Sequence, residues 1–394
     1  MPRPRAGSRL GRLLWGAFLL AEFPLLVAVT AGWGAGYLHP GPFWWAQLCA
    51  AFLPYLAVAL GAVTAVPLLF RRWGWVLVHA VPLVLVLSRG LPGDVLAASV
   101  EPRPDDLVLM TFNVPQSGPS AEQLGDSLAA LVGAVDPDLL ALQEAAVYGP
   151  RAADGAYRYL PPQVEGVVRR EGYRLPPVAW RAGTPELTEV PVLATRSGDP
   201  LPDVAAQTVV TSGSEADNVT EAVRLPFRWQ GRDAVLYNVH LRSYGVPKPW
   251  HDPALKVLDP RTWIPYLRGY RTAYGIRAGE VEDLVTHIAR ERLPVIVVGD
   301  FNEGPFSWAY RQLRDAGAER TDAFRAAGEG DGRTYHARRP VVRIDYVLAD
   351  PAFEVVSARV RATTFSDHRP LVVRLRWREE ARPQEAPDSL ETQE

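Results

Sequence analysis

Apolar residues dominate the first hundred positions of the chain, where they form three stretches that carry few charges. The stretches run from about Leu13 to Tyr37, from about Phe43 to Phe70 and from about Trp73 to Leu87. A helix that crosses a bilayer needs about 20 mostly apolar residues, so the first two stretches predict membrane spans. The third is shorter and contains His79 and Pro82, so it is either a third span or a re-entrant or interfacial segment.

Positive charges flank these stretches in a pattern that predicts their orientation. Four arginines precede the first stretch and two separate the second from the third: Arg3, Arg5, Arg9, Arg12, Arg71 and Arg72. Residues 36–42 carry no Lys or Arg. Because cytoplasmic loops are enriched in Lys and Arg, the N-terminus is predicted to be cytoplasmic, and three spans would place the following domain on the extracytoplasmic side. If the third segment does not cross, that domain is cytoplasmic instead.

A basic start followed by an apolar core is also the pattern of a signal peptide. Two more apolar stretches follow the first, however, so cleavage there would not release a soluble protein. Residues 1–100 are therefore interpreted as a multi-pass anchor in the cell membrane, with about three transmembrane helices.

The pattern changes after residues 101–106, which form a charged linker rich in proline. Short apolar runs of the strand type follow, and helical patterns separate some of them. The runs are Leu107–Phe112, Leu139–Leu142, Ala234–Val239, Val295–Val298, Ile344–Leu348 and Leu371–Leu375, and the helical patterns are Ala121–Val135 and Arg277–Arg290. This alternation predicts an α/β domain over residues 107–377, with two packed sheets covered by helices. The acidic tail, residues 378–394, has little apolar content and is predicted to be disordered.

Composition adds two restrictions to this interpretation. Lys and Arg number 42 against 44 Asp and Glu, so the overall charge does not indicate a polyanion partner, although a nuclease needs only a local positive groove. The single cysteine, Cys49, excludes an intramolecular disulfide and a cysteine-based metal cluster.

Polar side chains stand where the six apolar runs begin or end. They are Asn113, Glu144, His240, Asp300 with Asn302, Asp345, and Asp367 with His368. Asp and Asn are ordinary turn formers, so a single one of these residues is equally well explained by strand termination. Together they offer oxygen and imidazole donors without thiols, which predicts a hard-cation site with a histidine for proton transfer. Mg²⁺ is the predicted cation, because it prefers one or two carboxylates and completes its shell with water and phosphate oxygens.

Six segments resemble conserved motifs of the endonuclease/exonuclease/phosphatase superfamily, and they occur in the family's order. The segments are LVLMTFNV, DLLALQE, YNVHL, VIVVGDFNEGPFS, RIDYVLA and FSDHRPLVV, and the resemblance covers about Leu107 to Arg376. The superfamily includes DNase I-like nucleases, abasic-site endonucleases, inositol polyphosphate 5-phosphatases and neutral sphingomyelinases. The resemblance implies a four-layer α/β sandwich, in which two mixed β-sheets lie face to face with helices outside.

The resemblance also implies which residues bind the metal ion. Glu144 matches the family's principal metal-binding carboxylate, and Asn113 matches the neighbouring residue that helps to hold metal or phosphate. Asp367 matches the aspartate near the metal. Mg²⁺ is the expected ion, with Mn²⁺ as the alternative.

The other matched positions imply the catalytic roles. Asp300 corresponds to the aspartate that orients or deprotonates the attacking water, and Asn302 to the amide that steadies the phosphate. His368 corresponds to the histidine that stabilises the phosphorane or assists proton transfer, with Asp345 orienting it. His240 corresponds to the second histidine of the DNase I and sphingomyelinase branches. The charge that develops on phosphate oxygens during phosphoryl transfer is stabilised by groups of these kinds.

The acidic partner of the second histidine stays open among Glu165, Glu171 and Glu189. The substrate also stays open, because surface loops rather than the core motifs decide it. Arg242–Tyr270, rich in aromatic residues and proline, is the main candidate, as a lid over a lipid, a base-stacking platform or a packed loop.

The sequence as a whole predicts a membrane-anchored, Mg²⁺-dependent phosphodiesterase or phosphatase in which an activated water attacks a metal-bound phosphate. Its partners would be the lipid bilayer and a phosphoester substrate, namely a lipid headgroup, a small phosphoester or nucleic acid. A membrane-tethered nuclease for DNA or RNA is the first alternative. An inactive binding module is the second, although the intact Glu144, Asp300, Asn302 and His368 argue against it.

Overall fold

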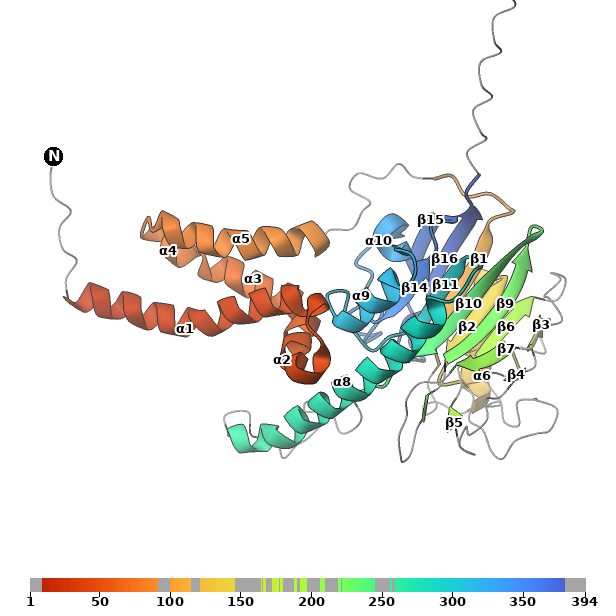
Figure 1. The fold of residues 1–394 in the computed structure, drawn as a ribbon, viewed down its shortest axis with the longest axis horizontal. Helices are drawn as coiled ribbons and strands as arrows, with labels where there is room; N and C mark the ends of the chain where they lie inside the picture. The colour runs from red at the N-terminus through yellow and green to blue at the C-terminus, as the bar shows by residue number, and fades with distance from the viewer. Residues whose placement is uncertain are drawn as a thin grey trace, which may run out of the picture.

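The computed structural model contains an elongated group of apolar helices that contacts one end of an α/β sandwich (Figure 1). It describes residues 9–90, 100–114, 121–145, 164, 166–167, 172–176, 178–179, 188–189, 192–196, 206–209, 219–220, 222–244, 256 and 259–379. The acidic tail from residue 380 and most of residues 245–258 lie outside the described residues.

Two seven-stranded mixed sheets form the sandwich. The first has the order β13 (Gly328–Glu329), β15 (Phe353–Val360), β16 (Leu371–Trp377), β1 (Leu107–Asn113), β2 (Leu139–Gln143), β6 (Val192–Arg196) and β3 (Tyr173–Arg174). The second has the order β12 (Thr321–Asp322), β14 (Asp345–Ala349), β11 (Val295–Asp300), β10 (Arg232–His240), β9 (Ala222–Trp229), β7 (Ala206–Val209) and β4 (Val178–Ala179). A separate pair joins β5 (Thr188–Glu189) to β8 (Val219–Thr220).

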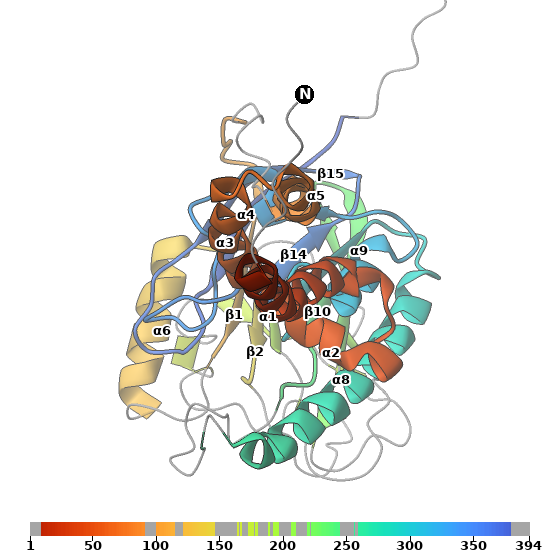
Figure 2. The ribbon, with the colours of Figure 1, turned by 90° about the vertical axis from the view of Figure 1, so that its left-hand side faces the viewer.

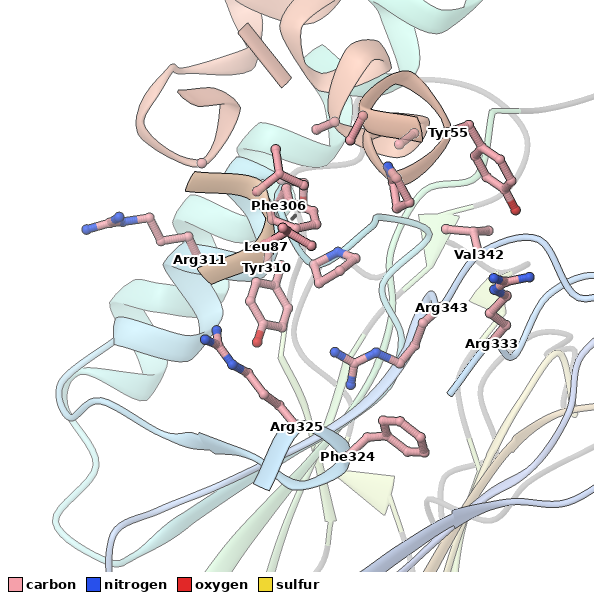
Figure 3. A pocket seen from close by; sticks show the side chains of 18 of the residues that line it. Tyr55, Leu87, Phe306, Tyr310, Arg311, Phe324, Arg325, Arg333, Val342 and Arg343 are labelled. Carbon is pink, nitrogen blue, oxygen red and sulfur yellow. Dashed lines mark hydrogen bonds between the residues drawn. The ribbon is translucent and has the colours of Figure 1, made fainter. Parts of the chain in front are cut away.

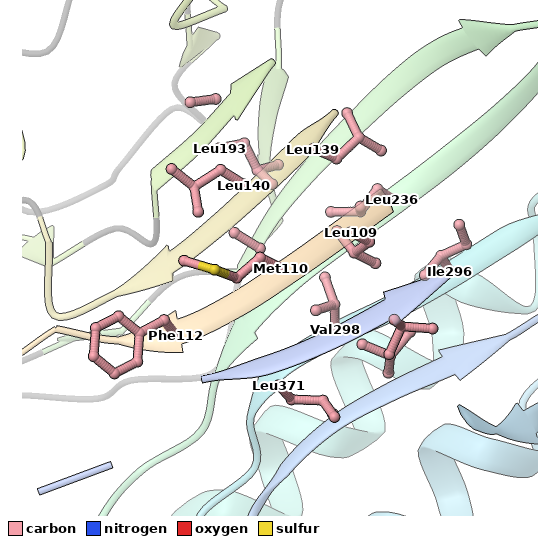
Figure 4. Packing of buried hydrophobic residues seen from close by; sticks show 14 of the residues in the cluster. Leu109, Met110, Phe112, Leu139, Leu140, Leu193, Leu236, Ile296, Val298 and Leu371 are labelled. Carbon is pink, nitrogen blue, oxygen red and sulfur yellow. The ribbon is translucent and has the colours of Figure 1, made fainter. Parts of the chain in front are cut away.

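The two sheets are joined by an apolar core that both of them supply. Leu109 and Leu140 from the first sheet and Leu236, Ile296 and Val298 from the second are fully buried in one cluster (Figure 4). The central strands β1 and β11 are nearly continuous apolar runs, because one face of each packs on the other sheet and the opposite face is covered as well.

Helices cover the two outer faces of the sandwich. α6 (Ala121–Val135) lies against the first sheet through Leu128 and Val132, whereas α8 (Pro260–Ile288) and α9 (Trp308–Asp315) lie against the second (Figure 2). A short helix, α10 (Ala323–Ala327), follows β12. The predicted arrangement of two packed mixed sheets flanked by helices is therefore confirmed.

α8 is longer than the sequence pattern predicted. The sequence pattern predicts a helix from Arg277 and a loop up to Tyr270, but the helix begins at Pro260. Asp259 caps it by accepting a hydrogen bond from the backbone N–H of Arg261, and a proline at the first helical position costs no hydrogen bond. Asp followed by Pro is thus a helix-start signal that the abundance of proline in this region concealed.

The N-terminal region consists of α1 (Arg9–Gly34), η1 (Ala35–Tyr37), α2 (Pro40–Ala51), α3 (Leu53–Val63), α4 (Ala65–Leu69) and α5 (Trp73–Gly90). Within the described residues, one helix, Gly11–Tyr37, is long and apolar enough to cross a membrane. The second predicted span is bent by 67° between Pro40–Ala51 and Leu53–Leu69, and the third predicted span, Trp73–Ser88, is shorter. Length and composition therefore support one span directly, or two if the bent pair is counted as one.

Gln47 of α2 connects the helical region to the sandwich. Its side-chain amide donates to the backbone carbonyls of Ala35 (3.0 Å) and Leu38 (2.8 Å), and its oxygen accepts from the backbone N–H of Trp308 (3.0 Å). Trp308 is the first residue of α9, so α2 stabilises the turn that follows β11. The side chain of Gln47 is fully buried, and both its amide nitrogen and its amide oxygen are hydrogen-bonded. The position of α2 against α9 is therefore fixed, because a shift would leave buried polar atoms unpaired.

Candidate active site

The strand registers bring the predicted site residues to one end of the sandwich. β1 and β2 run parallel with Asn113 opposite Gln143, so Asn113 and Glu144 leave the first sheet together. β10 and β11 run parallel with His240 opposite Asp300, and antiparallel β14 places Asp345 opposite Asp300. The carboxyl ends of parallel strands meet at one edge, which explains why residues far apart in the chain converge here.

Asn113 links the two sheets within this site. Its side-chain Nδ2 donates to Oε1 of Glu144 (3.2 Å) and to Oδ2 of Asp300 (3.0 Å). The Asp300 side chain is 1% exposed, whereas that of Glu144 is 37% exposed. Burial raises the pKa of Asp300, against the opposing charge of His368. One carboxylate therefore lies deep in the site and the other at its mouth.

Asn302 is held close to Asp300 by its backbone. Its N–H donates to Oδ1 of Asp300 (2.8 Å), and its side-chain Nδ2 donates to the carbonyl of Leu241 (2.9 Å). Asn302 and Glu144 have φ angles of 50° and 54°, in the left-handed region that non-glycine residues rarely adopt. Such conformations cost about 1–3 kcal/mol and cluster at functional sites.

Glycine is the only residue type that fits at position 299, directly before Asp300. Its φ is 132°, and a Cβ atom there would collide with the carbonyl oxygen of Val239 on the neighbouring strand. The glycine therefore permits the close approach of β10 and β11 that aligns His240 with Asp300.

His368 and Asp345 form a buried pair. Nδ1 of His368 lies 3.0 Å from Oδ2 of Asp345, and its Nε2 lies 3.7 Å from Oδ2 of Asp300. Burial by itself would lower the pKa of His368, but the carboxylates of Asp345 and Asp300 outweigh it and raise the pKa to about 10. The ring is therefore an imidazolium at neutral pH, oriented by Asp345 and directed at Asp300.

His240 occupies the opposite side of Asp300. Its Nε2 lies 3.8 Å from Oδ2 of Asp300 and 3.9 Å from Oε1 of Glu144. The ring is 8% exposed, and Nε2 is a buried atom without a hydrogen-bond partner among the described residues. An orphaned buried nitrogen between two carboxylates marks a place where substrate or water completes the site.

Asp367 differs from the other predicted residues. Its side chain is exposed, and its backbone carbonyl accepts a hydrogen bond from the N–H of Ala337 (2.7 Å). The carboxylate contributes to the raised pKa of His368 more weakly than Asp345 and Asp300 do. The structure thus places Asp367 beside the site rather than in the buried cluster. The side chains of Glu165, Glu171 and Glu189 lie outside the described residues, so the partner of His240 among them stays open.

The ligand atoms of Asp300, Asp345 and His368 all lie within 4.8 Å of one another, so this group could hold a metal ion. Within this group Nδ1 of His368 is already engaged with Asp345, which leaves Nε2 of the ring and Asp300 facing one another. Glu144 and Asn113 offer oxygen donors at the more open side of the same cluster, which fits a hard cation better.

Two supporting residues receive no role from the sequence, although Ser366 lies within the FSDHRPLVV motif. The Ser366 hydroxyl donates to the carbonyl of Asn113 (2.9 Å) and accepts from the N–H of His368 (3.0 Å). The Thr334 hydroxyl accepts from the N–H of Asp345 (3.2 Å). Ser366 is noticeable in the sequence by its position beside Asp367 and His368, whereas no sequence pattern indicates Thr334.

Replacing Asp345 by asparagine is expected to move the alkaline limb of the pH–rate profile to lower pH, because it removes the charge that most raises the pKa of His368. The raised pKa also means that stability due to the imidazolium is fully present below about pH 6.5 and is lost as the pH rises towards about 10. Hydrolysis rates and thermal unfolding across this range check both effects. Glu354→Gln, a change near the surface, is the control and should leave the alkaline limb of the pH–rate profile unchanged. If Asp345→Asn also left this limb unchanged, Asp345 would not be the residue that raises the pKa of His368.

Comparison with known proteins agrees with this geometry. The profile of the endonuclease/exonuclease/phosphatase family matches residues 110–368, and the chain belongs to this family, whose members hydrolyse phosphoester bonds. A search of curated proteins finds no match.

Several solved structures resemble the chain at low sequence identity. A family protein from Leptotrichia buccalis is 16% identical, covering 69% of this chain and 100% of its own, with a TM-score of 0.47. The human Nocturnin catalytic domain with bound sulfate is 18% identical, covering 73% and 100%, with a TM-score of 0.46. A mannosyl-6-phosphatase from Bacteroides thetaiotaomicron is 16% identical, covering 69% and 100%, with a TM-score of 0.44.

Proposed function

We propose that this chain is a membrane-anchored, divalent-cation-dependent hydrolase of a lipid headgroup or another small phosphoester. The observation that carries the proposal is the position of Asp300, which is buried between two imidazoles and held by Asn113 from the other sheet. A carboxylate with a raised pKa beside an imidazolium supplies both a proton acceptor and a cationic donor, as phosphoryl transfer to water requires.

The chain's own residues then take distinct roles. Asp300 accepts a proton from the attacking water as the water oxygen bonds to phosphorus. The bond from phosphorus to the leaving oxygen breaks, and that oxygen departs with the electron pair and takes up a proton from solvent. His368 donates a hydrogen bond to a phosphate oxygen, and Asp345 keeps its ring protonated and oriented. His240 directs its unpaired Nε2 to the phosphate or to the leaving oxygen, and Asn302 steadies the phosphate.

Glu144, Asn113 and Asp367 are the residues proposed to hold Mg²⁺, with Mn²⁺ as the alternative. Hard oxygen donors and the partly exposed Glu144 carboxylate fit such a cation, which keeps several water ligands. When bound, the cation supplies positive charge that stabilises the phosphate oxygens.

Exposed apolar side chains on the N-terminal helices support membrane anchoring. Leu20 of α1 is 79% exposed, Val58 of α3 is 75% exposed and Leu69 of α4 is 78% exposed. Large exposed apolar surfaces mark contact with a membrane or another protein. Glu22 of α1 and His79 of α5 lie 3.1 Å apart and are buried, as ionisable groups within a membrane bundle usually are. These features extend the proposal to a multi-pass anchor that includes α3–α4 and α5.

Basic residues gather at the end of this bundle that lies away from the sandwich. The Arg72 guanidinium, between α4 and α5, lies 5.2 Å from the Trp15 ring near the start of α1 (Figure 1). Since Arg-rich and Lys-rich ends of membrane helices usually lie on the cytoplasmic side, the catalytic domain at the other end is proposed to be extracytoplasmic.

The test uses the full chain in detergent or nanodiscs, with Mg²⁺ or EDTA. The panel comprises phosphoinositides, sphingomyelin, a small phosphodiester, plasmid DNA, abasic-site duplex and RNA. We expect Mg²⁺-dependent release of a lipid headgroup or cleavage of the small ester, lost in His368→Ala. Cleavage of only nucleic acid would replace the proposal by the nuclease alternative. Inactivity on every substrate, with a folded, metal-binding protein, would favour a binding module.

A further inference from the structure

A cavity of about 750 Å³ separates the N-terminal helices from the sandwich, and none of the predicted site residues lines it. Figure 3 shows that arginines and the rings of Phe306, Tyr310 and Phe324 line its sandwich side. Val58 of α3 and Leu83 and Leu87 of α5 form an apolar wall. The other wall belongs to the catalytic domain and carries five arginines and three carboxylates. Asp315 and Glu319 form ion pairs with Arg311 and Arg314, which leaves Arg325, Arg333 and Arg343 to be considered.

The arginines of this wall are not equally neutralised. Arg343 is fully paired, because its guanidinium donates two bonds of 2.7 Å to buried Asp322. Arg325 is half-buried and points towards Tyr310, and its guanidinium has no acidic partner within the described part of the chain (Figure 3). Arg333 is 45% exposed, its Nη1 donates to the carbonyl of Pro340 (3.3 Å), and its Nε lies 4.0 Å from the exposed Asp331, a contact that contributes little. The positive charges of Arg325 and Arg333 are therefore not neutralised by a close carboxylate and can attract an anion.

The apolar wall continues outside the cavity. Val58 is 75% exposed, Leu87 is 56% exposed, and Val84 on the same helix is 61% exposed. In the proposed membrane arrangement these side chains face lipid, and the cavity lies where the helices leave the bilayer towards the catalytic domain. Its volume is within the range of small-molecule pockets.

We propose that this cavity binds an acidic phospholipid of the surrounding bilayer, with the phosphate at Arg325 and Arg333 and the acyl chains against α3 and α5. The inference rests on the proposed membrane anchoring, but it does not depend on catalysis. Charge complementarity selects the occupant, since Arg binds phosphate oxygens and the wall opposite is apolar. A neutral ligand would leave Arg325 unpaired, and an inorganic anion would leave the apolar wall without contacts.

The test measures saturable binding of short-chain phosphatidylglycerol to the full chain in detergent, by native mass spectrometry. Phosphatidylcholine and inorganic phosphate are the comparison ligands. We expect phosphatidylglycerol to bind more tightly than either, and Arg325→Gln with Arg333→Gln to weaken it at least about tenfold. Arg290→Gln with Arg292→Gln, at exposed positions directly after α8 that do not line the cavity, removes the same charge and should change nothing.

Three outcomes would overturn the proposal: equal binding of phosphatidylcholine, equal binding of inorganic phosphate, or unchanged binding in the Arg325→Gln and Arg333→Gln protein. A dimer that this variant disrupts, without any effect of lipid, would assign the cavity to contact between copies of the chain. If the double variant unfolds, Arg325→Gln alone tests whether phosphatidylglycerol binding depends on this wall of the cavity. Asp300→Asn separates this proposal from the proposed function, because it should abolish hydrolysis and leave phosphatidylglycerol binding intact.

Discussion

Asp300→Asn is expected to lower kcat by about 100- to 10,000-fold while the protein stays folded. The amide has nearly the same shape, and its oxygen can still accept the hydrogen bond from the N–H of Asn302, although its nitrogen no longer accepts from Nδ2 of Asn113. It cannot accept a proton from water, and it no longer presents a negative charge to His368 or His240. Steady-state rates on the substrate identified by the panel, together with thermal unfolding, measure the two effects separately.

The matched control for this prediction is Asp233→Asn. Asp233 forms an ion pair with Arg228 on the surface of the β9–β10 hairpin, and its side chain is 42% exposed. Removing this charge should alter kcat by less than about twofold, because exposed pairs contribute little. If Asp300→Asn kept more than about a tenth of the wild-type rate, Asp300 would not be the proton acceptor.

Arg277→Met is expected to lower the free energy of unfolding by about 3–5 kcal/mol, because it leaves a buried carboxylate without its cation. Arg277 is 1% exposed, pairs with Glu303 and donates to the carbonyl of Arg242 (2.8 Å). Its guanidinium also lies 4.7 Å from the Tyr244 ring, which adds a cation–π contact. Chemical denaturation of the full chain in detergent measures the loss.

The same substitution should also reduce activity. Arg242 is two residues beyond His240, and Glu303 directly follows Asn302, so Arg277 joins the two segments that carry these side chains. Arg228→Met, which breaks an exposed pair with Asp233, is the control and should cost less than about 1 kcal/mol. Adding Glu303→Leu to Arg277→Met should restore part of the stability, since no unpaired charge then remains. A small loss for Arg277→Met would show that Glu303 is protonated or solvated.

The candidate site was largely predictable because its residues adjoin short, strongly apolar strands. Asn113, Glu144 and Asp300 each follow such a run, so the sequence placed them at strand ends before their contacts were known. The contacts themselves were not predictable. The bond from Asn113 to Asp300 crosses 187 positions of sequence and joins the two sheets, which no local pattern encodes.

Where sequence reasoning was incomplete, long-range packing decided the outcome. The second apolar stretch predicted a span, but the structure bends it by 67° between α2 and α3, where Gln47 and Tyr55 contact the sandwich. The Tyr55 hydroxyl donates to the carbonyl of Val341 at 2.7 Å. Composition reports how apolar a segment is, and it does not report which polar partners draw the segment away from a straight helix.

The sequence by itself determined the α/β class, the apolar N-terminal region and the identity of the polar residues at the strand ends, because periodicity and motif order are local properties of the chain. Only the tertiary structure decided that Asn113 donates to Asp300 across the two sheets, that Arg277 joins the segments after His240 and Asn302, and that Arg325 faces a cavity lined by α3 and α5. Those outcomes depend on which strands and helices meet in space, and the free energies of burial and pairing that fix them arise between residues far apart in sequence.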